Sequence, residues 1–273
     1  MHYCDRFKVL PGKKVHLGEI ESRQNGGLTK EMALPSLEEN RQRLDAFQQL
    51  LYAEHRRSLL VIFQAMDCGG KDGTIRHVMG QLNPQGCRVT SFKAPSLEEL
   101  DHDFLWRIHR VVPPKGMIGV FNRSHYEDVL IARVRDLVPK AVWSKRFGQI
   151  NAFESALAAA GVHIVKLFLH ISSEEQLERL RARLEDPQKH WKIDPADFEE
   201  RRYWDAYHRA YEDVLRRCST DDAPWYVVPA DRKWFRNLVV SEILVETMES
   251  FGMEYPAPVA DIGQLRRRYG EDA

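Results

Sequence analysis

The stretch LLVIFQAMDCGGKDGTIRHVMGQL, residues 59–82, decides the fold. It begins with five apolar residues in a row, which is typical of a strand buried inside a parallel sheet. Residues 64–73 interrupt this run with three glycines, and the apolar residues that follow have helical spacing. A strand, a glycine-rich loop and a helix start in this order direct several backbone N–H groups into one concavity, with the positive end of the helix dipole behind them. The stretch therefore predicts a phosphate-binding loop.

The loop contains a lysine at the position that the P-loop pattern G-x-x-x-x-G-K-[ST] requires. Lys71 follows Gly70 directly, and its ammonium could neutralise a phosphate during transfer. Two positions differ from the pattern: Ala65 replaces the first glycine, and Asp72 stands where a hydroxyl normally contacts magnesium. Thr74 is then the nearest hydroxyl, and a glycine-rich turn with a solvated lysine is the alternative interpretation. The predicted phosphate-binding residues of this segment are Gly69, Gly70, Gly73 and Thr74.

The composition is that of an ordinary globular enzyme. The chain has 273 residues, of which 43% are hydrophobic and 29% charged. Its 40 basic and 40 acidic residues cancel, so no overall field attracts nucleic acid or an anionic membrane, and any polyanion site must be local. The four cysteines lack C-x-x-C spacing, which predicts neither disulfides nor structural zinc. Scattered cysteines of this kind fit a reducing cytoplasm. The N-terminus shows no charged stretch followed by an apolar one, and no apolar run approaches the roughly 20 residues that span a bilayer, so we expect a protein that is neither exported nor inserted in a membrane.

Four more apolar runs follow, with helical stretches between them, and this alternation predicts an α/β fold with a five-stranded parallel sheet. The runs cover 87–92, 116–121, 162–169 and 225–228. The predicted helices cover 36–57, 96–110, 124–137, 145–160, 173–184, 195–218 and 233–251. We predict an N-terminal arm at 1–35, one domain at 36–255 that includes a mobile cover at about 183–197, and a C-terminal tail at 256–273.

Magnesium is an expected partner of transferred phosphates, and the loop has a carboxylate that could hold it. Asp67 lies four residues before Lys71 and could bind the ion directly or through water. The alternative is a turn aspartate that makes a local backbone hydrogen bond.

Further polar residues follow the run 116–121, and in doubly wound sheets ligands lie at the carboxyl ends of the strands. Asn122 and Arg123 come first, and Arg123 would project near the phosphates. Glu127 and Asp128, one turn into the next helix, could bind metal or orient a phosphoryl acceptor. Equally, they could be acids that the helix dipole favours at its N-terminus.

The cover carries cations that could reach the open face when it closes. Arg183, Lys189 and Lys192 would then exclude water from the reacting phosphate. A solvated run of charges is the alternative. Trp191 could stack on a base, but the sequence defines no base pocket.

Three separated motifs resemble the polyphosphate kinase 2 family: MDCGGKDGT at 66–74, FNRSHYEDVL at 121–130 and EDPQKHWK at 185–192. The likeness extends over roughly 28–255. It implies a P-loop kinase fold like that of thymidylate kinase, three-layered (α/β/α) with a helical lid, and magnesium-dependent transfer of phosphate between inorganic polyphosphate and adenine or guanine nucleotides. It also implies a homo-oligomer, a dimer or a tetramer.

The resemblance also implies roles for single residues. The family's loop aspartate and lysine fall on Asp67 and Lys71, and its arginine after the strand falls on Arg123. Asn122 stands where many relatives have a metal-binding aspartate, and Glu127 where many have an asparagine. This variant resembles the subgroup that phosphorylates both nucleoside mono- and diphosphates, and Glu127 or Asp128 could replace the missing metal ligand. The lid cations fall on Arg183, Lys189 and Lys192, and the basic track expected for polyphosphate adds Arg201 and Arg202.

Two other functions remain open at this point. An ordinary nucleotide kinase with ATP as the donor would use the same phosphate loop. A non-catalytic sensor of polyphosphate or nucleotide would also explain the departures at Ala65, Asp72 and Asn122.

Overall fold

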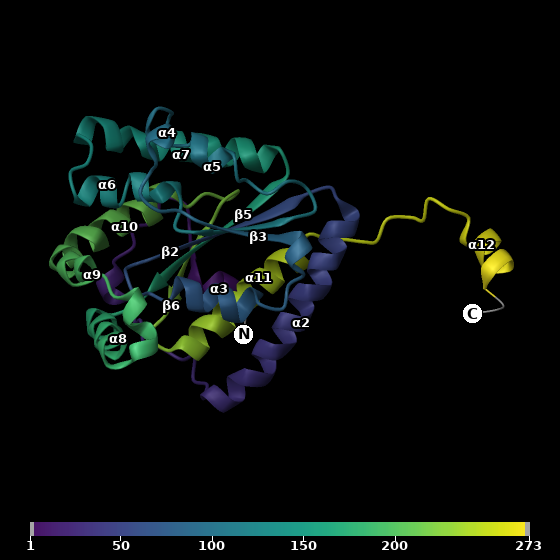
Figure 1. Ribbon diagram of the computed structural model, residues 1–273, viewed down its shortest axis with the longest axis horizontal. Helices are drawn as coiled ribbons and strands as arrows, with labels where there is room; N and C mark the ends of the chain where they lie inside the picture. Colours follow the sequence, from purple (N-terminus) through teal and green to yellow (C-terminus); the bar gives the residue numbers. More distant parts are fainter. Residues whose placement is uncertain (1–2, 271–273) are drawn as a thin grey trace.

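The strand before the phosphate loop lies inside a mixed six-stranded sheet (Figure 1). The structure is a computed structural model that describes residues 3–270. The strand, β2 (Ser58–Ala65), is buried along its whole length. Its alternate residues belong to two apolar clusters, Leu59 to the larger and Leu60 to the smaller. Because side chains alternate across a strand, both faces of β2 need apolar residues, which explains the unbroken run.

The five predicted strands are all present, but the sheet has a sixth. The order is β1-β6-β5-β2-β4-β3, and every neighbouring pair is parallel except β1 with β6. The prediction of a purely parallel five-stranded sheet is therefore wrong at this edge. A strand of two residues is too short to show a periodic pattern, so β1 has no signal in the sequence. The remaining strands are β1 (Lys8–Val9), β3 (Cys87–Ser91), β4 (Ile118–Asn122), β5 (Val162–His170) and β6 (Trp225–Pro229).

Helices lie on both faces of the sheet (Figure 1). On one face α2 (Lys30–Glu54) and α3 (Lys71–Met79) pack against α11 (Lys233–Glu249). On the other face α6, α7 and α10 pack together. The other helices are α1 (Tyr3–Phe7), α4 (Leu97–Leu100), α5 (Trp106–His109), α6 (Ile131–Val134), α7 (Lys140–Ala159), α8 (Ser173–Glu185), α9 (Pro195–Glu200), α10 (Trp204–Cys218) and α12 (Ile262–Tyr269). Short 3-10 helices are η1 (Leu17–Glu19), η2 (Pro84–Gly86), η3 (His125–Asp128), η4 (Pro187–Lys192) and η5 (Arg201–Tyr203).

Several helices differ from the predicted ranges. The helix α2 begins before the predicted Ser36, because the Thr29 side chain caps it by accepting a hydrogen bond from Met32 N at 3.3 Å. The predicted helix 124–137 is instead η3 followed by α6, so Glu127 and Asp128 do not lie in the first turn of a long helix. The predicted helix 96–110 is divided into α4 and α5, and the helix 195–218 into α9, η5 and α10.

The first thirty residues carry structure of their own. Tyr3, Phe7 and Leu17 are buried in the main core. The Asp231 carboxylate accepts hydrogen bonds from the Ser22 hydroxyl at 3.0 Å and from Ser172 N at 2.9 Å, which ties this segment to the start of α8. The domain limits at 35 and 256 stay predictions.

The other end of the chain looks different. In Figure 1 the helix α12 stands apart from the sheet and its helices, and its residues are exposed. Within residues 3–270, no helix has the length and apolar character that a membrane crossing requires.

Candidate active site

The phosphate loop joins β2 to α3, and two of its glycines are required by close contacts. A Cβ at Gly69 would overlap the Ala65 side chain and lie 2.8 Å from Met66 O. Gly70 has a φ of 97°, which favours glycine, and a Cβ there would overlap the guanidinium of Arg236. The chain therefore passes Arg236 with no room for a side chain at Gly70.

A cavity of about 870 Å³ opens above this loop. It lies at the carboxyl ends of β2, β3 and β4, as expected for a sheet of this type. Its acidic lining residues are Asp67, Asp72 and Asp197. Its basic ones are Lys71, Lys93, Arg123, Arg179, Arg183, Lys189, Lys192, Lys233 and Arg236. Nine cations against three carboxylates make a strongly positive cavity in a neutral protein, which suits a polyanionic ligand.

Lys71, the predicted phosphate-loop lysine, is one of the residues that line this cavity. Its Nζ donates a hydrogen bond to Ala65 O at 3.2 Å, back across the loop. Burial and the neighbouring Arg123 lower the pKa of Lys71, although the Asp67 and Glu127 carboxylates oppose this shift. An anionic phosphate beside it would favour the charged form further.

Arg123 and Asp67 form an ion pair on the cavity wall. Arg123 Nη2 donates to Asp67 Oδ1 at 2.9 Å. The arginine backbone has a φ of 64°, a left-handed conformation, and its N–H donates to Phe63 O at 3.0 Å. Burial alone would lower the pKa of Arg123, but the Glu127 and Asp67 carboxylates outweigh burial and raise it. The Arg123 guanidinium therefore stays charged where it lines the cavity.

Two of the residues that depart from the expected patterns, Asp72 and Asn122, contact each other. Asn122, at the end of β4, donates from Nδ2 to Asp72 Oδ1 at 2.6 Å, and both line the cavity. Asp72 is one of the two departures from the P-loop pattern, and Asn122 is the position where the family resemblance predicts an aspartate. The pair places a carboxylate beside Lys71 from the loop side rather than from β4.

Thr74 and Asp128 do not line the cavity. Thr74 is fully buried, and its hydroxyl donates to Gly70 O at 2.9 Å within α3. Asp128 accepts a hydrogen bond from Arg146 at 3.0 Å, and burial raises its pKa despite that arginine. Glu127 is not among the lining residues either, but it is close enough to raise the pKa of Arg123. Within residues 3–270, no three His, Cys, Asp or Glu side chains gather at metal-ligand spacing, so Asp67, Glu127 and Asp128 do not form a three-ligand cluster.

A buried ion pair holds the turn η3 from behind. Lys166 is fully buried and donates to the Tyr126 hydroxyl at 2.8 Å, and it also pairs with Glu154. His125 Nε2 lies 3.1 Å from the same Glu154 carboxylate. These groups fix the backbone that carries Glu127, and the contact with Glu154 gives His125 a structural role.

The predicted cover lies over the cavity. Arg183, near the end of α8, donates to Asp197 Oδ2 at 3.0 Å. Lys189 pairs with Asp186 at 2.7 Å, and Lys192 Nζ lies 4.8 Å from the centre of the Trp191 ring. All three predicted lid cations line the cavity. Two other track candidates point elsewhere, because Arg201 donates to Ser173 O and Gln176, and Arg202 pairs with Glu199.

Arg236 is the most telling lining residue that sequence reasoning missed. It is 2% exposed, and its Nε and Nη2 donate to the neutral Asn237 amide oxygen at 3.1 and 2.8 Å. Burial and the nearby Arg179 lower its pKa to about 9, and no carboxylate among residues 3–270 contributes to that shift. The sequence did contain one sign of this residue's role, because Arg236 lies within the largely apolar stretch 234–240. A buried cation without an acidic partner fits a site that an anionic ligand completes.

Arg179 reaches the loop from α8. It donates to Cys68 O at 2.9 Å, to Ala230 O at 2.6 Å and to Glu175 at 2.8 Å. A single guanidinium therefore connects the phosphate loop to the end of β6 and to the helix α8.

Comparisons with known proteins agree with this geometry. The family model described as polyphosphate kinase 2 (PPK2) matches residues 27–255. The chain is 50% identical over 257 residues to an AMP/ADP-polyphosphate phosphotransferase of Meiothermus ruber, covering 93% of this chain and 96% of that one. It is 50% identical over 264 residues to an ADP-polyphosphate phosphotransferase of Rhodopseudomonas palustris, covering 92% of this chain and 91% of that one.

A solved structure is similar over almost the entire fold. The crystal structure of polyphosphate kinase 2 from Arthrobacter aurescens TC1 superposes with a TM-score of 0.95 at 41% identity, covering 99% of this chain and 97% of that one.

Proposed function

Because the chain belongs to the polyphosphate kinase 2 family, we propose that it transfers the terminal phosphate of inorganic polyphosphate to ADP and AMP, forming ATP and ADP. The observation that carries this proposal is the cavity lined by nine cations and three carboxylates above the phosphate loop. A nucleotide with two or three phosphates needs fewer cations than this, whereas a polyphosphate chain can occupy them all. The Meiothermus ruber relative is named for polyphosphate with AMP and ADP, and the Rhodopseudomonas palustris relative for polyphosphate with ADP.

The reaction exchanges one phosphoanhydride bond for another. An oxygen of the acceptor's terminal phosphate attacks the end phosphorus of the chain, and the bond to the next phosphate breaks. Lys71 and the loop N–H groups hold the transferred group, and Arg123 stabilises the charge that spreads over its oxygens. Since like bonds form and break, the direction follows the concentrations.

Magnesium is part of the proposal. Magnesium in phosphoryl-transfer sites is bound by one or two carboxylates together with substrate phosphates and water, and it neutralises charge on the phosphate oxygens. The carboxylates of Asp67 and Asp72 line the cavity on either side of Lys71, so the residues present fit such an ion. Of the three predicted metal ligands, Asp67 is the one that lines the cavity.

The finer structural and biological expectations also belong to this proposal. We infer a P-loop kinase fold of the thymidylate kinase type, with Arg183, Lys189 and Lys192 on a lid that closes over the donor. We also propose a homo-oligomer in the cytoplasm, where the four cysteines would stay unpaired as they are in the structure. Guanine nucleotides are tested by replacing ADP and AMP with GDP and GMP.

The decisive experiment incubates the purified protein with long-chain polyphosphate, magnesium and either ADP or AMP, and separates the nucleotides by chromatography. We expect ATP from ADP, and ADP followed by ATP from AMP. The matched control is Lys71→Ala, which should lose several orders of magnitude in turnover. Its thermal unfolding should change little, because the only hydrogen bond that the side chain makes within residues 3–270 is the one to Ala65 O at 3.2 Å.

Other results would point to the alternative functions. Product with ATP as the donor but none with polyphosphate would make the protein an ordinary nucleotide kinase. Tight binding of polyphosphate without turnover would make it a sensor. Near-normal turnover in Lys71→Ala would refute the assigned role of the loop.

A further inference from the structure

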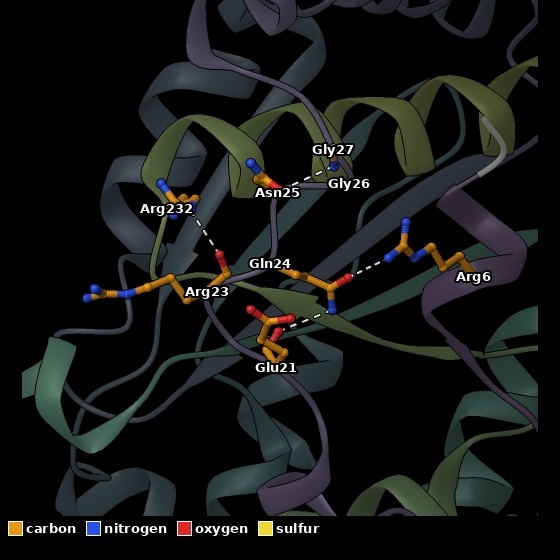
Figure 2. A pocket seen from close by; sticks show the side chains of 8 residues that line it. All are labelled: Arg6, Glu21, Arg23, Gln24, Asn25, Gly26, Gly27 and Arg232. Atoms are coloured by element: carbon orange, nitrogen blue, oxygen red, sulfur yellow. Dashed lines mark hydrogen bonds between the residues drawn. The ribbon is translucent and has the colours of Figure 1, made fainter.

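Two surface features lie outside the catalytic cavity and have no part in the proposed reaction. The first is a pocket of about 380 Å³ whose lining includes Arg6, Arg23 and Arg232 (Figure 2). These arginines are engaged within the chain. Arg6 donates to the Gln24 amide oxygen at 2.6 Å. Arg232 donates to Arg23 O at 2.9 Å, and Arg23 itself pairs with Glu175. The pocket therefore ties the N-terminal segment to the rest of the fold, whereas the second feature, which follows α11, stands free of it.

The second feature is the C-terminal arm, which we define as residues 254–270 and which is exposed along its whole length. Pro256 and Pro258 fix φ at two nearby positions and keep the connecting chain extended. The arm leads to α12, which stands apart from the sheet and its helices (Figure 1). Within residues 3–270, the hydrogen bonds of α12 all lie inside 261–270. Isolated helices shorter than roughly 12–15 residues are marginal in water, so this helix of eight residues needs a further surface to pack against.

One face of α12 is apolar and has positive charge on both sides. Ile262, Leu265 and Tyr269 recur at intervals of three and four residues, so they share a face, and they are 41%, 43% and 63% exposed. Arg266 comes four residues after Ile262, and Arg268 three after Leu265, which places one arginine on each flank of that face. The helix sequence contains no acidic residue. Such a helix suits an apolar surface that is bordered by carboxylates.

The fold presents a surface of this kind on the α4 segment, which we define as residues 96–103. Leu97 and Leu100 are three residues apart on α4, so they share one side of it, and they are 84% and 64% exposed. No lysine or arginine lies in this segment. Its exposed carboxylates are those of Glu98, Asp101 and Asp103. The α4 segment therefore has the apolar side chains and the negative charge that α12 lacks a partner for.

We propose that α12 of one chain docks on the α4 segment of a second copy, and that two chains exchange their C-terminal arms in this way. The charges are complementary, and the exposed apolar residues of each segment cover those of the other. The arm and the α4 segment together supply about 25 residues per chain, within the roughly 20–30 residues per side of a standard protein interface.

The direction of the arm and the symmetry of the exchange favour a second copy. In Figure 1 the arm leads away from the fold that carries α4, so its helix is presented outward rather than to its own chain. A reciprocal exchange closes under two-fold symmetry and yields a dimer. This inference rests on the homo-oligomer of the proposed function but on no part of its chemistry.

Sedimentation equilibrium of the full chain, without any substrate, tests the inference. We expect the wild type to associate into a dimer or a larger assembly. Its dissociation constant should rise about tenfold or more in Arg266→Glu, Arg268→Glu and also in Glu98→Lys, Asp101→Lys, because like charges then face each other. The combination of all four substitutions restores opposite charges and should recover most of the affinity. Thermal unfolding of each variant verifies the fold.

The matched control is Lys13→Glu, Lys14→Glu, which reverses two exposed charges of the N-terminal segment and should leave the association unchanged. A monomeric wild type would overturn the inference together with the proposed homo-oligomer. Unchanged association in the Arg266, Arg268 variant would overturn the inference and leave the homo-oligomer in place. Losses in both charge variants without recovery in their combination would refute α4 as the docking surface.

Phosphatidylserine vesicles test the other surface that a basic amphipathic helix can bind. Vesicle binding by the wild type that the Arg266, Arg268 variant loses, with the association of the two proteins equal, would assign the arm to an anionic lipid surface and overturn the inference. The assay with polyphosphate tests the transfer reaction separately.

Discussion

Arg236 and Gly70 show how the site depends on one close contact. The guanidinium occupies the space that a side chain at Gly70 would need, and its charge is buried beside a neutral amide. Such a cation costs folding free energy unless an anion accompanies it. We interpret Arg236 as a residue that the ligand, rather than the protein, neutralises.

This interpretation predicts opposite effects on binding and stability in Arg236→Met. The KM for polyphosphate should rise at least tenfold, because a buried charge contact is lost. The free energy of unfolding should stay the same or increase by about 1 kcal/mol, because an apolar side chain of similar length replaces an unpaired charge. Kinetics and urea unfolding of the same preparation measure both. A marked loss of stability with unchanged KM would show that Arg236 is a structural residue.

Glu127 is expected to influence the choice of acceptor. The family resemblance predicts an asparagine at this position, and the Glu127 carboxylate raises the pKa of both Lys71 and Arg123. In Glu127→Asn the ratio of kcat/KM for AMP to that for ADP should change severalfold, while thermal unfolding changes little. Parallel progress curves with the two acceptors measure the ratio. The same ratio in both proteins would rule out a role in acceptor choice.

At the scale of elements, the segment from α8 to α9 should move when the donor binds. Its cations line the cavity, and Trp191 on η4 is 79% exposed beside them. Closure would remove the indole from water. The hydrogen bond from Arg183 in α8 to Asp197 in α9 joins the two ends of this segment.

Tryptophan fluorescence can report this movement. Adding polyphosphate should change the emission of the wild type, and most of the change should be absent from Trp191→Phe. In Lys189→Gln, Lys192→Gln the change should need a higher polyphosphate concentration, and more so at high salt. An equal change in Trp191→Phe would show that the signal comes from another tryptophan and that this segment stays in place.

The elements also show what the sequence could reveal. Long apolar runs located β2, β4 and β5, and because their carboxyl ends share one sheet edge, Lys71, Asn122 and Arg123 were expected together and do line one cavity. Helix periodicity does not say which helical cations face the site. Arg179 and Arg236 were missed for this reason, since they come from helices far along the chain. Thr74 was predicted to bind phosphate because it is the hydroxyl residue next to the loop. In the structure its hydroxyl instead donates to Gly70 O at the start of α3.

At the scale of the molecule, a buried histidine of the sheet contacts the N-terminal segment and makes the stability depend on pH. His170 Nε2, at the end of β5, lies 3.1 Å from Ile20 O. Burial and the nearby His208 lower the pKa of His170 from 6.5 to about 4, although the Ile20 carbonyl and Asp231 oppose this shift. The folded protein therefore keeps His170 neutral at pH values where the unfolded chain binds a proton.

The direction of the pH effect follows. Between about pH 6.5 and 4 the unfolded state binds more protons, so stability falls as the pH falls, and His170 accounts for up to about 3 kcal/mol of this loss. In His170→Gln, whose amide can still donate to Ile20 O, urea unfolding should show a shallower decline over this range. Parallel declines in the two proteins would assign the pH dependence to other groups.

The antiparallel pairing of β1 with β6 has a consequence for synthesis on the ribosome. Lys8 pairs with Tyr226, so the first strand to leave the exit tunnel pairs with the last strand of the sheet to be made. During translation the apolar side chains of Tyr3, Phe7 and Val9 stay exposed to water until β6 and α11, which cover them, have left the ribosome. Contacts between residues so distant in sequence form late and slow folding. The nascent chain is therefore expected to need a chaperone at its amino end until its closing strand is available.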